Sequence, residues 1–140
     1  MTNGKSRVIL HAEDEPVHAA IVRIALQRNF GNVQLNQVGD GKAALDYLYR
    51  RGSYEDSTVS PRPDLILLDL RMPHVSGLEV LAIVKNDPEL QAIPVVVLTT
   101  SDIEEDRSKA RSCGVDDYLT KPVDFDKFVD MIKQMCVTWL

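Results

Sequence analysis

Two short, continuous apolar segments constrain the fold of this chain more than any other feature. Residues 64–70 read Asp-Leu-Ile-Leu-Leu-Asp-Leu, and residues 93–98 read Ile-Pro-Val-Val-Val-Leu. Each segment is too short for a core helix, and neither alternates polar and apolar residues as a half-exposed strand would. Continuous apolar strands are typical of parallel sheets, because both faces of such a sheet are covered. The segments therefore predict two central strands of a parallel sheet.

The rest of the chain alternates between strand and helix patterns. Shorter strands are predicted at 8–12, 33–38 and 117–120, and apolar residues at helical spacing follow the strands. Strands that alternate with helices predict an α/β fold, a five-stranded parallel sheet with helices on both faces. The length of 140 residues suits a single domain over 1–140.

Two local patterns give further detail. Ser101 and Glu104 have the spacing of a capping box, which predicts that a helix opens at Ser101, and Gly114 is its expected stop. Residues 50–63 are polar and form a longer connection than most compact domains contain. We expect a surface loop there, and a partner-contact loop is the alternative.

The composition narrows the class of protein. With 44% hydrophobic and 26% charged residues, the chain is typical of a globular domain. A net charge of -5 argues against binding to nucleic acid, which needs clustered cations. No segment approaches the roughly 18 apolar residues of a membrane span. Cys113 and Cys136 match neither a metal-binding spacing nor a disulfide framework, so a cytoplasmic location is expected.

Reactive side chains stand where the predicted strands end. Glu13 and Asp14 follow the first strand, Asp69 follows the third, Thr99 the fourth and Lys121 the fifth. In α/β sheets, ligands bind outside the carboxyl ends of the strands. We therefore expect three carboxylates, a hydroxyl and an ammonium to meet at one edge of the sheet.

Such a cluster favours phosphoryl chemistry. Three close carboxylates repel one another, and one of them must hold a proton unless a cation joins them. Mg²⁺ suits the site because it prefers oxygen ligands and keeps several waters. An ionised Asp69 is then a candidate nucleophile, and the Lys121 ammonium and Thr99 hydroxyl are candidate partners for phosphoryl oxygens. Each residue alone has a simpler interpretation as a cap, a turn residue or a surface charge. Their joint placement on four strand ends is what favours a site.

Together these residues resemble the receiver domain of response regulators in two-component signalling. The resemblance covers residues 7–137 and is carried by four motifs. They are Glu13-Asp14, Leu68-Asp69-Leu-Arg-Met-Pro73 with Gly77, Pro94-Val-Val-Val-Leu-Thr99, and Tyr118-Leu-Thr-Lys121-Pro122. The resemblance implies a flavodoxin-like sheet with strand order 2-1-3-4-5.

The family also implies a role for each residue of the site. Asp69 is expected to accept a phosphoryl group from a sensor histidine kinase or a phosphotransfer protein. Asp14, Asp69 and the Arg71 backbone carbonyl are expected to bind Mg²⁺ directly, and Glu13 through water. Lys121 is expected to pair with the phosphoryl group, and the peptide bond before Pro122 to be cis.

A switch is implied as well. Thr99 is expected to turn toward the phosphoryl oxygen and Tyr118 to change rotamer, which alters the face made by the fourth helix, fifth strand and fifth helix. The resemblance also implies that the domain assists its own phosphorylation and dephosphorylation and is not expected to be a conventional enzyme. With no DNA-binding module in the given sequence and a net charge of -5, its output is expected to be a protein contact, and a role as a phosphate sink or relay is the alternative.

Some positions depart from the family pattern or are open. Glu13 replaces the commoner aspartate. Arg71 either shields the acyl phosphate or reaches outward to solvent. His11 is expected to be a hydrogen-bonded strand histidine, and His18 and His74 to be surface residues.

The segment 46–52 and the Trp139-Leu140 ending resemble single-domain regulators that serve phytochrome-type kinases. Those regulators often form homodimers through their C-terminal face. Trp139 either packs on its own domain or anchors such an interface.

Three alternatives are weighed. An aspartate-nucleophile phosphatase needs a second acid shortly after the nucleophile as proton donor, and Arg71 stands there, so the sequence speaks against it. A flavodoxin-like FMN binder shares the architecture but needs a phosphate loop where Glu13-Asp14 stands. A degenerate receiver would act only as a phosphorylation-independent scaffold.

Overall fold

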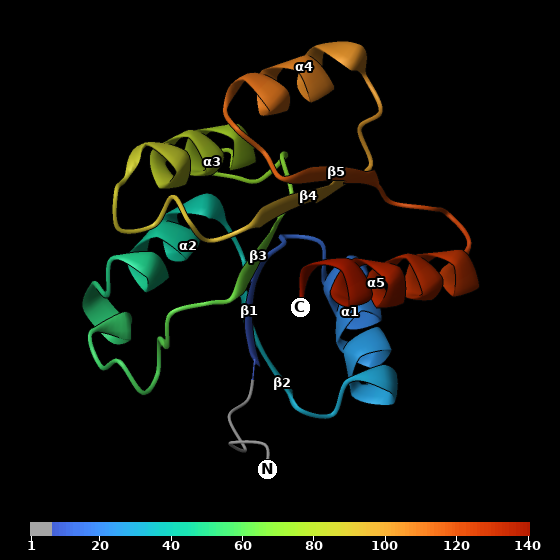
Figure 1. Ribbon diagram of the computed structural model, residues 1–140, viewed down its shortest axis with the longest axis horizontal. Helices are drawn as coiled ribbons and strands as arrows, with labels where there is room; N and C mark the ends of the chain where they lie inside the picture. Colours follow the sequence, from blue (N-terminus) through green and yellow to red (C-terminus); the bar gives the residue numbers. More distant parts are fainter. Residues whose placement is uncertain (1–6) are drawn as a thin grey trace.

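The computed structural model describes residues 7–140 and contains five strands and five α-helices in alternation (Figure 1). In chain order these are β1 (Arg7–Ala12), α1 (Pro16–Asn29), β2 (Val33–Val38), α2 (Gly41–Leu48), β3 (Leu65–Leu68), α3 (Gly77–Asn86), β4 (Val95–Thr99), α4 (Glu104–Ser112), β5 (Asp117–Thr120) and α5 (Phe125–Trp139). Both continuous apolar segments form strands, which confirms the prediction. The single-domain prediction over 1–140 includes residues 1–6, which lie outside the described residues.

The strands form one parallel sheet in the order β2-β1-β3-β4-β5. This order and the α/β class are those expected. Helices α1 and α5 lie on one face of the sheet, and α2, α3 and α4 lie on the other (Figure 1). Strands β3 and β4 are buried along their whole length, because helices cover both faces.

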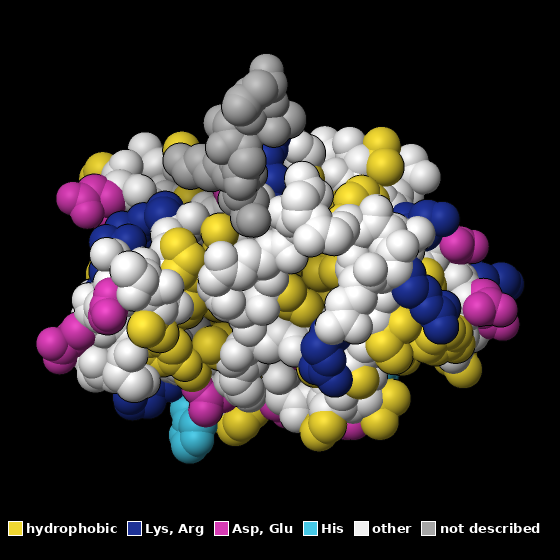
Figure 2. Space-filling view, turned by 90° about the horizontal axis from the view of Figure 1, so that it is seen from below, with side chains coloured by type: hydrophobic (Ala, Val, Ile, Leu, Met, Phe, Trp, Pro, Cys, Tyr) yellow, Lys and Arg dark blue, Asp and Glu magenta, His cyan; other side chains and the backbone are white. Residues whose placement is uncertain are grey.

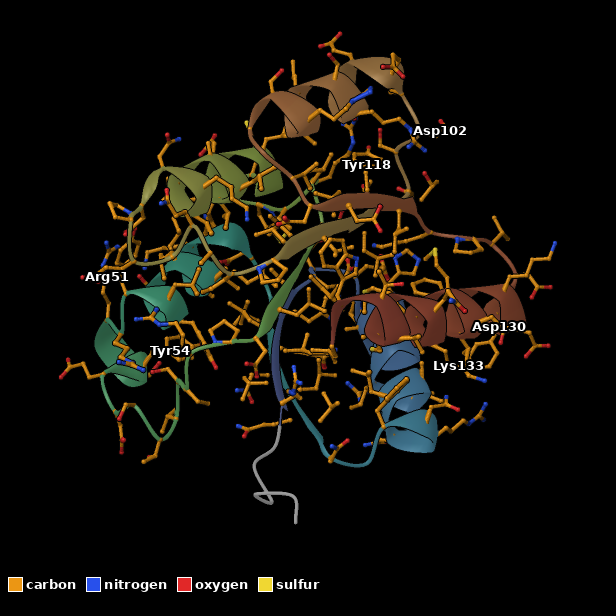
Figure 3. The ribbon with its side chains drawn as sticks, viewed as in Figure 1. Arg51, Tyr54, Asp102, Tyr118, Asp130 and Lys133 are labelled. Atoms are coloured by element: carbon orange, nitrogen blue, oxygen red, sulfur yellow. The ribbon has the colours of Figure 1, made fainter. Side chains whose placement is uncertain are left out.

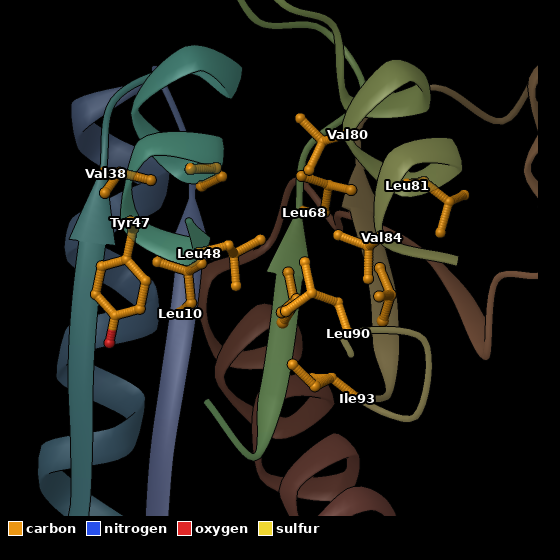
Figure 4. Packing of buried hydrophobic residues seen from close by; sticks show 14 of the residues in the cluster. Leu10, Val38, Tyr47, Leu48, Leu68, Val80, Leu81, Val84, Leu90 and Ile93 are labelled. Carbon is orange, nitrogen blue, oxygen red and sulfur yellow. The ribbon is translucent and has the colours of Figure 1, made fainter. Parts of the chain in front are cut away.

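Each face of the sheet has its own apolar core. On the α2–α3 face, Leu10, Leu68 and Tyr47 belong to one cluster with the buried side of α3, and Figure 4 shows Leu68 next to α3 and Tyr47 on the side of Val38. On the α1–α5 face, Ile9 and Phe128 belong to the second cluster. Figure 2 views the molecule from the side where β1 begins, and there hydrophobic side chains lie scattered among polar ones. The functional residues lie at the opposite ends of the strands.

The predicted capping box is wrong. Helix α4 begins at Glu104 after Ile103, and no side chain caps it. The backbone stays extended through Ile103, so the Ser101 hydroxyl accepts from the Ile103 N–H at 3.4 Å, ahead of the helix, and donates to Asp106 Oδ2 at 2.5 Å. The expected stop is confirmed, since Gly114 follows the helix with a φ of 92°.

The segment 50–63 is a surface connection anchored to the domain. It contains a short 3₁₀ turn at Gly52–Tyr54. Tyr47 donates its hydroxyl to the Pro61 carbonyl at 2.7 Å, and the buried Ser60 donates to the Tyr54 carbonyl at 2.7 Å. The surface-loop prediction is thus confirmed, and a partner contact through this loop stays a prediction. Among residues 7–140, no helix is both long and apolar enough to cross a membrane.

Candidate functional site

The register of β1 and β3 brings the carboxylates together. Ala12 pairs with Leu68, so the residues that follow them leave the sheet side by side. The Asp69 N–H also donates to the Ala12 carbonyl at 3.1 Å. As a result, one carboxylate oxygen from each of Glu13, Asp14 and Asp69 lies within 4.8 Å of the others. The predicted meeting of three acids at one sheet edge is confirmed.

Lys121 completes the cluster from β5. Its ammonium lies 2.6 Å from Glu13 Oε1 and 3.1 Å from Asp69 Oδ2, and its side chain is only 2% exposed. The Lys121 N–H donates to the Thr99 carbonyl at 2.7 Å, which fixes the chain where β5 leaves the sheet. A buried ammonium is stable only when it is paired, and here two carboxylates surround it.

The peptide bond before Pro122 is trans, because no peptide bond in the described chain is cis. The expectation of a cis bond is wrong for this structure. The trans form is intrinsically favoured by about 0.5–1 kcal/mol before proline. Lys121 reaches both carboxylates with the trans peptide, so its ion pairs supply no contact that requires the cis form.

The cluster shifts the proton affinities of its acids. Burial raises the pKa of Glu13 to about 7, even though the Lys121 ammonium opposes this. Burial also acts to raise the pKa of Asp69, but hydrogen bonding to Glu13 and the charge of Lys121 outweigh it and lower that pKa. One acid therefore tends to hold a proton while Asp69 stays ionised, as expected for crowded carboxylates beside a single cation.

The donor set fits a hard divalent cation. Carboxylate oxygens are the ligands that Mg²⁺ prefers, and Asp14 is exposed, which leaves room for bound water. The Arg71 N–H donates to Asp69 Oδ1 at 3.3 Å, so the backbone of Arg71 lies beside the phosphoacceptor candidate.

Thr99 and Tyr118 lie on the path from this cluster to α4. Thr99 is fully buried, and its hydroxyl accepts from the Ser101 N–H at 3.4 Å. Tyr118 donates its hydroxyl to the Ser101 carbonyl at 2.8 Å, and the Arg107 guanidinium stands 4.7 Å from the centre of its ring. Figure 3 shows Tyr118 between β5 and α4. The loop after β4 thus contacts both predicted switch residues.

The side chain of Arg71 reaches away from the carboxylates. Its guanidinium donates to Asp106 Oδ2 on α4 at 2.9 Å, and the side chain is 64% exposed. Of the two orientations left open by the sequence, the structure shows the outward one. Asp106 also accepts from the Ser101 hydroxyl, so it joins the loops after β3 and β4.

His11 and His74 lie as expected. His11 is buried in β1, and its Nδ1 lies 3.1 Å from Gln37 Nε2. Burial and the charge of Lys121 lower the pKa of His11 to about 3, so the ring is neutral. His74 is exposed in the loop before α3.

His18 is half-buried at the surface, and it makes a contact with the site that was not predicted from the sequence. Its Nδ1 lies 3.0 Å from Lys121 Nζ. One sequence signal could have found it, because His18 stands four residues after Asp14 in the first turn of α1, just beyond the strand end that carries the acids.

Comparison with known proteins identifies the family. Residues 9–133 match the model of the response regulator receiver domain. The chain belongs to this family. It is 40% identical to Response regulator Rcp1 of Synechocystis over 134 residues, which cover 96% of this chain and 89% of Rcp1. It is 39% identical to the probable methanogenesis regulatory protein FilR2 of Methanothrix harundinacea over 95% of this chain and 83% of that protein.

Solved structures agree with this assignment. The phosphorylated cyanobacterial phytochrome response regulator RcpA superposes with a TM-score of 0.90 at 36% identity, over 96% of this chain and 94% of RcpA. The Mn²⁺-bound form of Rcp1 gives a TM-score of 0.88 at 40% identity, with the same coverage of both chains. This receiver is therefore a phosphoacceptor of two-component signalling. Receivers are phosphorylated by histidine kinases and bind a divalent metal, and the FMN alternative is not favoured.

Proposed function

We propose that Asp69 is the residue of this receiver that accepts the phosphoryl group. The observation that carries the proposal is the placement of its carboxylate at a sheet edge, 3.1 Å from the buried Lys121 ammonium and beside Glu13 and Asp14. The donor is a phosphohistidine on a histidine kinase or a phosphotransfer protein. The P–N bond of the donor breaks, a P–O bond to an Asp69 oxygen forms, and the imidazole leaves with a proton from solvent.

The surrounding residues divide the work of charge neutralisation. Asp14, Asp69 and the Arg71 carbonyl would hold Mg²⁺, and Glu13 would contact it through water. When bound, such an ion would supply neutralisation of charge on the phosphoryl oxygens. Lys121 is already turned toward Asp69 and donates to a second phosphoryl oxygen. The Thr99 hydroxyl donates to a third when it leaves the Ser101 N–H.

The contacts of Ser101 support a route from Thr99 to an output face. Thr99 and Tyr118 both bond to Ser101, so a shift of one changes the surroundings of the other. A hollow of about 470 Å³ lies between α4 and β5, and Arg107 and Tyr118 line it. We infer that the α4-β5-α5 face binds a downstream protein partner. The protein acts as a signal carrier and not as a conventional enzyme, and its cytoplasmic location stays a prediction.

A phytochrome-type histidine kinase is the proposed phosphodonor partner. The support is the similarity to RcpA, whose description names it a phytochrome response regulator, over 96% of this chain. A homodimer through the C-terminal face is proposed as well. In this structure Trp139 packs on its own domain and lies 3.4 Å from Asp117 Oδ2. If the dimer forms, Trp139→Ala should weaken it in sedimentation velocity, and an unaltered profile counts against this face.

The test of the acceptor is intact mass after incubation with acetyl phosphate. We expect one added phosphoryl group, dependent on Mg²⁺ and absent in Asp69→Asn. Asp64→Asn is the matched control, because Asp64 stands at the opposite end of the same strand and its carboxylate accepts from the Val8 N–H, far from the cluster. Uptake that survives in Asp69→Asn moves the acceptor elsewhere.

The competing function is a scaffold that binds partners without phosphorylation. Complete acidic and basic groups at the site argue against it, since unused buried charges are costly. If neither acetyl phosphate nor a purified kinase phosphorylates the wild-type protein, the scaffold is the better description.

A further inference from the structure

The Lys121 ammonium has a third partner that the roles above do not use. An ammonium has three N–H donors and no acceptor. Lys121 Nζ donates two hydrogen bonds, to Glu13 and Asp69. Its third partner is His18 Nδ1, which lies 3.0 Å away. Because Lys121 is purely a donor, Nδ1 must be the acceptor. His18 is therefore the neutral ring with its proton on Nε2.

His18 is held in place by packing from the other helix on the same face. It belongs to the first turn of α1, and its ring centre lies 5.9 Å from that of Phe128 in α5. Phe128 is 1% exposed. Burial and the charge of Lys121 lower the pKa of His18, which agrees with a neutral acceptor. The imidazole is thus fixed between two helices with its lone pair toward Lys121.

We propose that His18 is a positioning residue, which holds the Lys121 ammonium at Asp69 while the carboxylates engage the metal ion and the phosphoryl group. The inference rests on the proposed role of Asp69. Glu13 and Asp69 offer carboxylate oxygens, which a hard cation prefers as ligands, whereas such a cation has little preference for the imidazole nitrogen of His18. When their oxygens are engaged, His18 is the partner that keeps Lys121 Nζ at the site. Few water molecules reach a side chain that is 2% exposed, so solvent is a poor substitute for the imidazole.

Two substitutions separate hydrogen bonding from packing. His18→Asn places an oxygen near the position of Nδ1 but loses most of the contact with Phe128. His18→Leu keeps an apolar side chain against Phe128 but offers no acceptor. If the hydrogen bond matters, the asparagine variant stays active and the leucine variant slows. If His18 acts only by packing on Phe128, the leucine variant stays active and the asparagine variant slows.

The rate constant for phosphorylation by acetyl phosphate at saturating Mg²⁺ is the first readout. We expect a roughly tenfold loss in His18→Leu, the size of one hydrogen bond to a charged group, and a loss of less than threefold in His18→Asn. A rate in His18→Leu within twofold of wild type overturns the proposal. Equal losses in both variants overturn it too, because they assign the effect to packing.

A second readout needs neither metal nor phosphodonor. The lysine ammonium groups are observed by ¹H–¹⁵N NMR, with Lys121 assigned by its loss in Lys121→Arg. We expect a slowly exchanging Lys121 signal in wild type and His18→Asn, and faster exchange in His18→Leu. Equal exchange in all three proteins contradicts the contact. If the wild type takes up no phosphoryl group, the assignment of Asp69 fails, while the NMR result still decides whether His18 holds Lys121.

Discussion

Replacing Gly77 with alanine should damage the fold and the phosphoacceptor together, because α3 begins against the backbone of Asp69. A Cβ at Gly77 would stand 2.0 Å from the Asp69 carbonyl oxygen and 2.7 Å from Leu70 Cα. Real Cβ atoms essentially never come closer than 3.0 Å to another heavy atom. The first turn of α3 and the end of β3 must therefore separate by about 1 Å, because a close-packed interior leaves no other room for the added Cβ.

The expected cost has a structural and a functional part. The atoms that the added Cβ would meet belong to the backbone of Asp69 and Leu70, not to flexible side chains. Hydrogen bonds hold this backbone, because the Asp69 N–H donates to the Ala12 carbonyl and the Gly77 N–H donates to the Leu70 carbonyl at 3.0 Å. Overpacking of this kind costs about 1–3 kcal/mol of unfolding free energy. A misplacement of about 1 Å at a reacting group slows a reaction by about 100-fold. We expect phosphorylation of Gly77→Ala to fall by that order.

Gly31→Ala is the matched control. Gly31 lies in the turn between α1 and β2, and an added Cβ there meets no heavy atom within 4 Å. Its stability should stay within about 0.5 kcal/mol of wild type, as for other surface substitutions. Urea unfolding followed by circular dichroism measures both variants. With a slope of about 1–3 kcal/mol per M urea, Gly77→Ala should unfold roughly 1 M earlier.

Equal urea midpoints for the two alanine variants would contradict the predicted clash at Gly77. The predicted clash is also refuted if Gly77→Ala accepts phosphoryl groups at the wild-type rate, because the carboxylate would then have kept its position despite the added atom.

Three further predictions concern other parts of the molecule. The pKa of His11 is lowered to about 3 in the folded protein, so protonation of this buried ring opposes folding. Its contribution to the unfolding free energy is complete above the unfolded pKa of 6.5, and on the order of 5 kcal/mol is lost as the pH falls from 6.5 to about 3. The unfolding free energy of His11→Asn should fall less over the same pH range. Burial raises the pKa of the Cys136 thiol to about 11. Iodoacetamide at pH 8 should therefore label Cys113 and spare Cys136 in the folded protein, and equal labelling of the two would contradict the burial of Cys136. The Arg71 side chain of the Arg71–Asp106 ion pair is mostly exposed to solvent. Arg71→Ala should therefore change the unfolding free energy, measured by urea unfolding, by less than about 1 kcal/mol. A larger change would mean that the ion pair with Asp106 of α4 stabilises the fold more than an exposed pair does.

The sequence predicted most of the site because strand ends in a parallel sheet share one edge. The continuous apolar strands fixed where β3 and β4 run, and the reactive residues follow these strands directly. Glu13, Asp14, Asp69 and Lys121 were therefore expected to meet, and the structure brings them together. The resemblance to receivers added the strand order and the roles, which composition and spacing do not supply.

Some local features were predicted incorrectly. Ser101 has the spacing of a helix cap, yet it bonds to Asp106 and the helix begins after Ile103. A spacing rule does not give the backbone conformation, and the chain stays extended at Ile103, so the helix begins two residues later than the rule implies. The bond before Pro122 was expected to be cis from the family alone, and it is trans.

The amino-acid sequence by itself determined the fold class, the sheet edge that carries the chemistry and the residues that gather there, because apolar periodicity and strand ends are local properties of the chain. Only the tertiary structure decided where side chains of distant segments point. Arg71 reaches out to Asp106 rather than to Asp69, and His18 turns its Nδ1 to Lys121, more than a hundred residues along the chain. Such contacts depend on the packing of α1 against α5 and of α4 against the sheet, which bring together atoms that no local pattern relates.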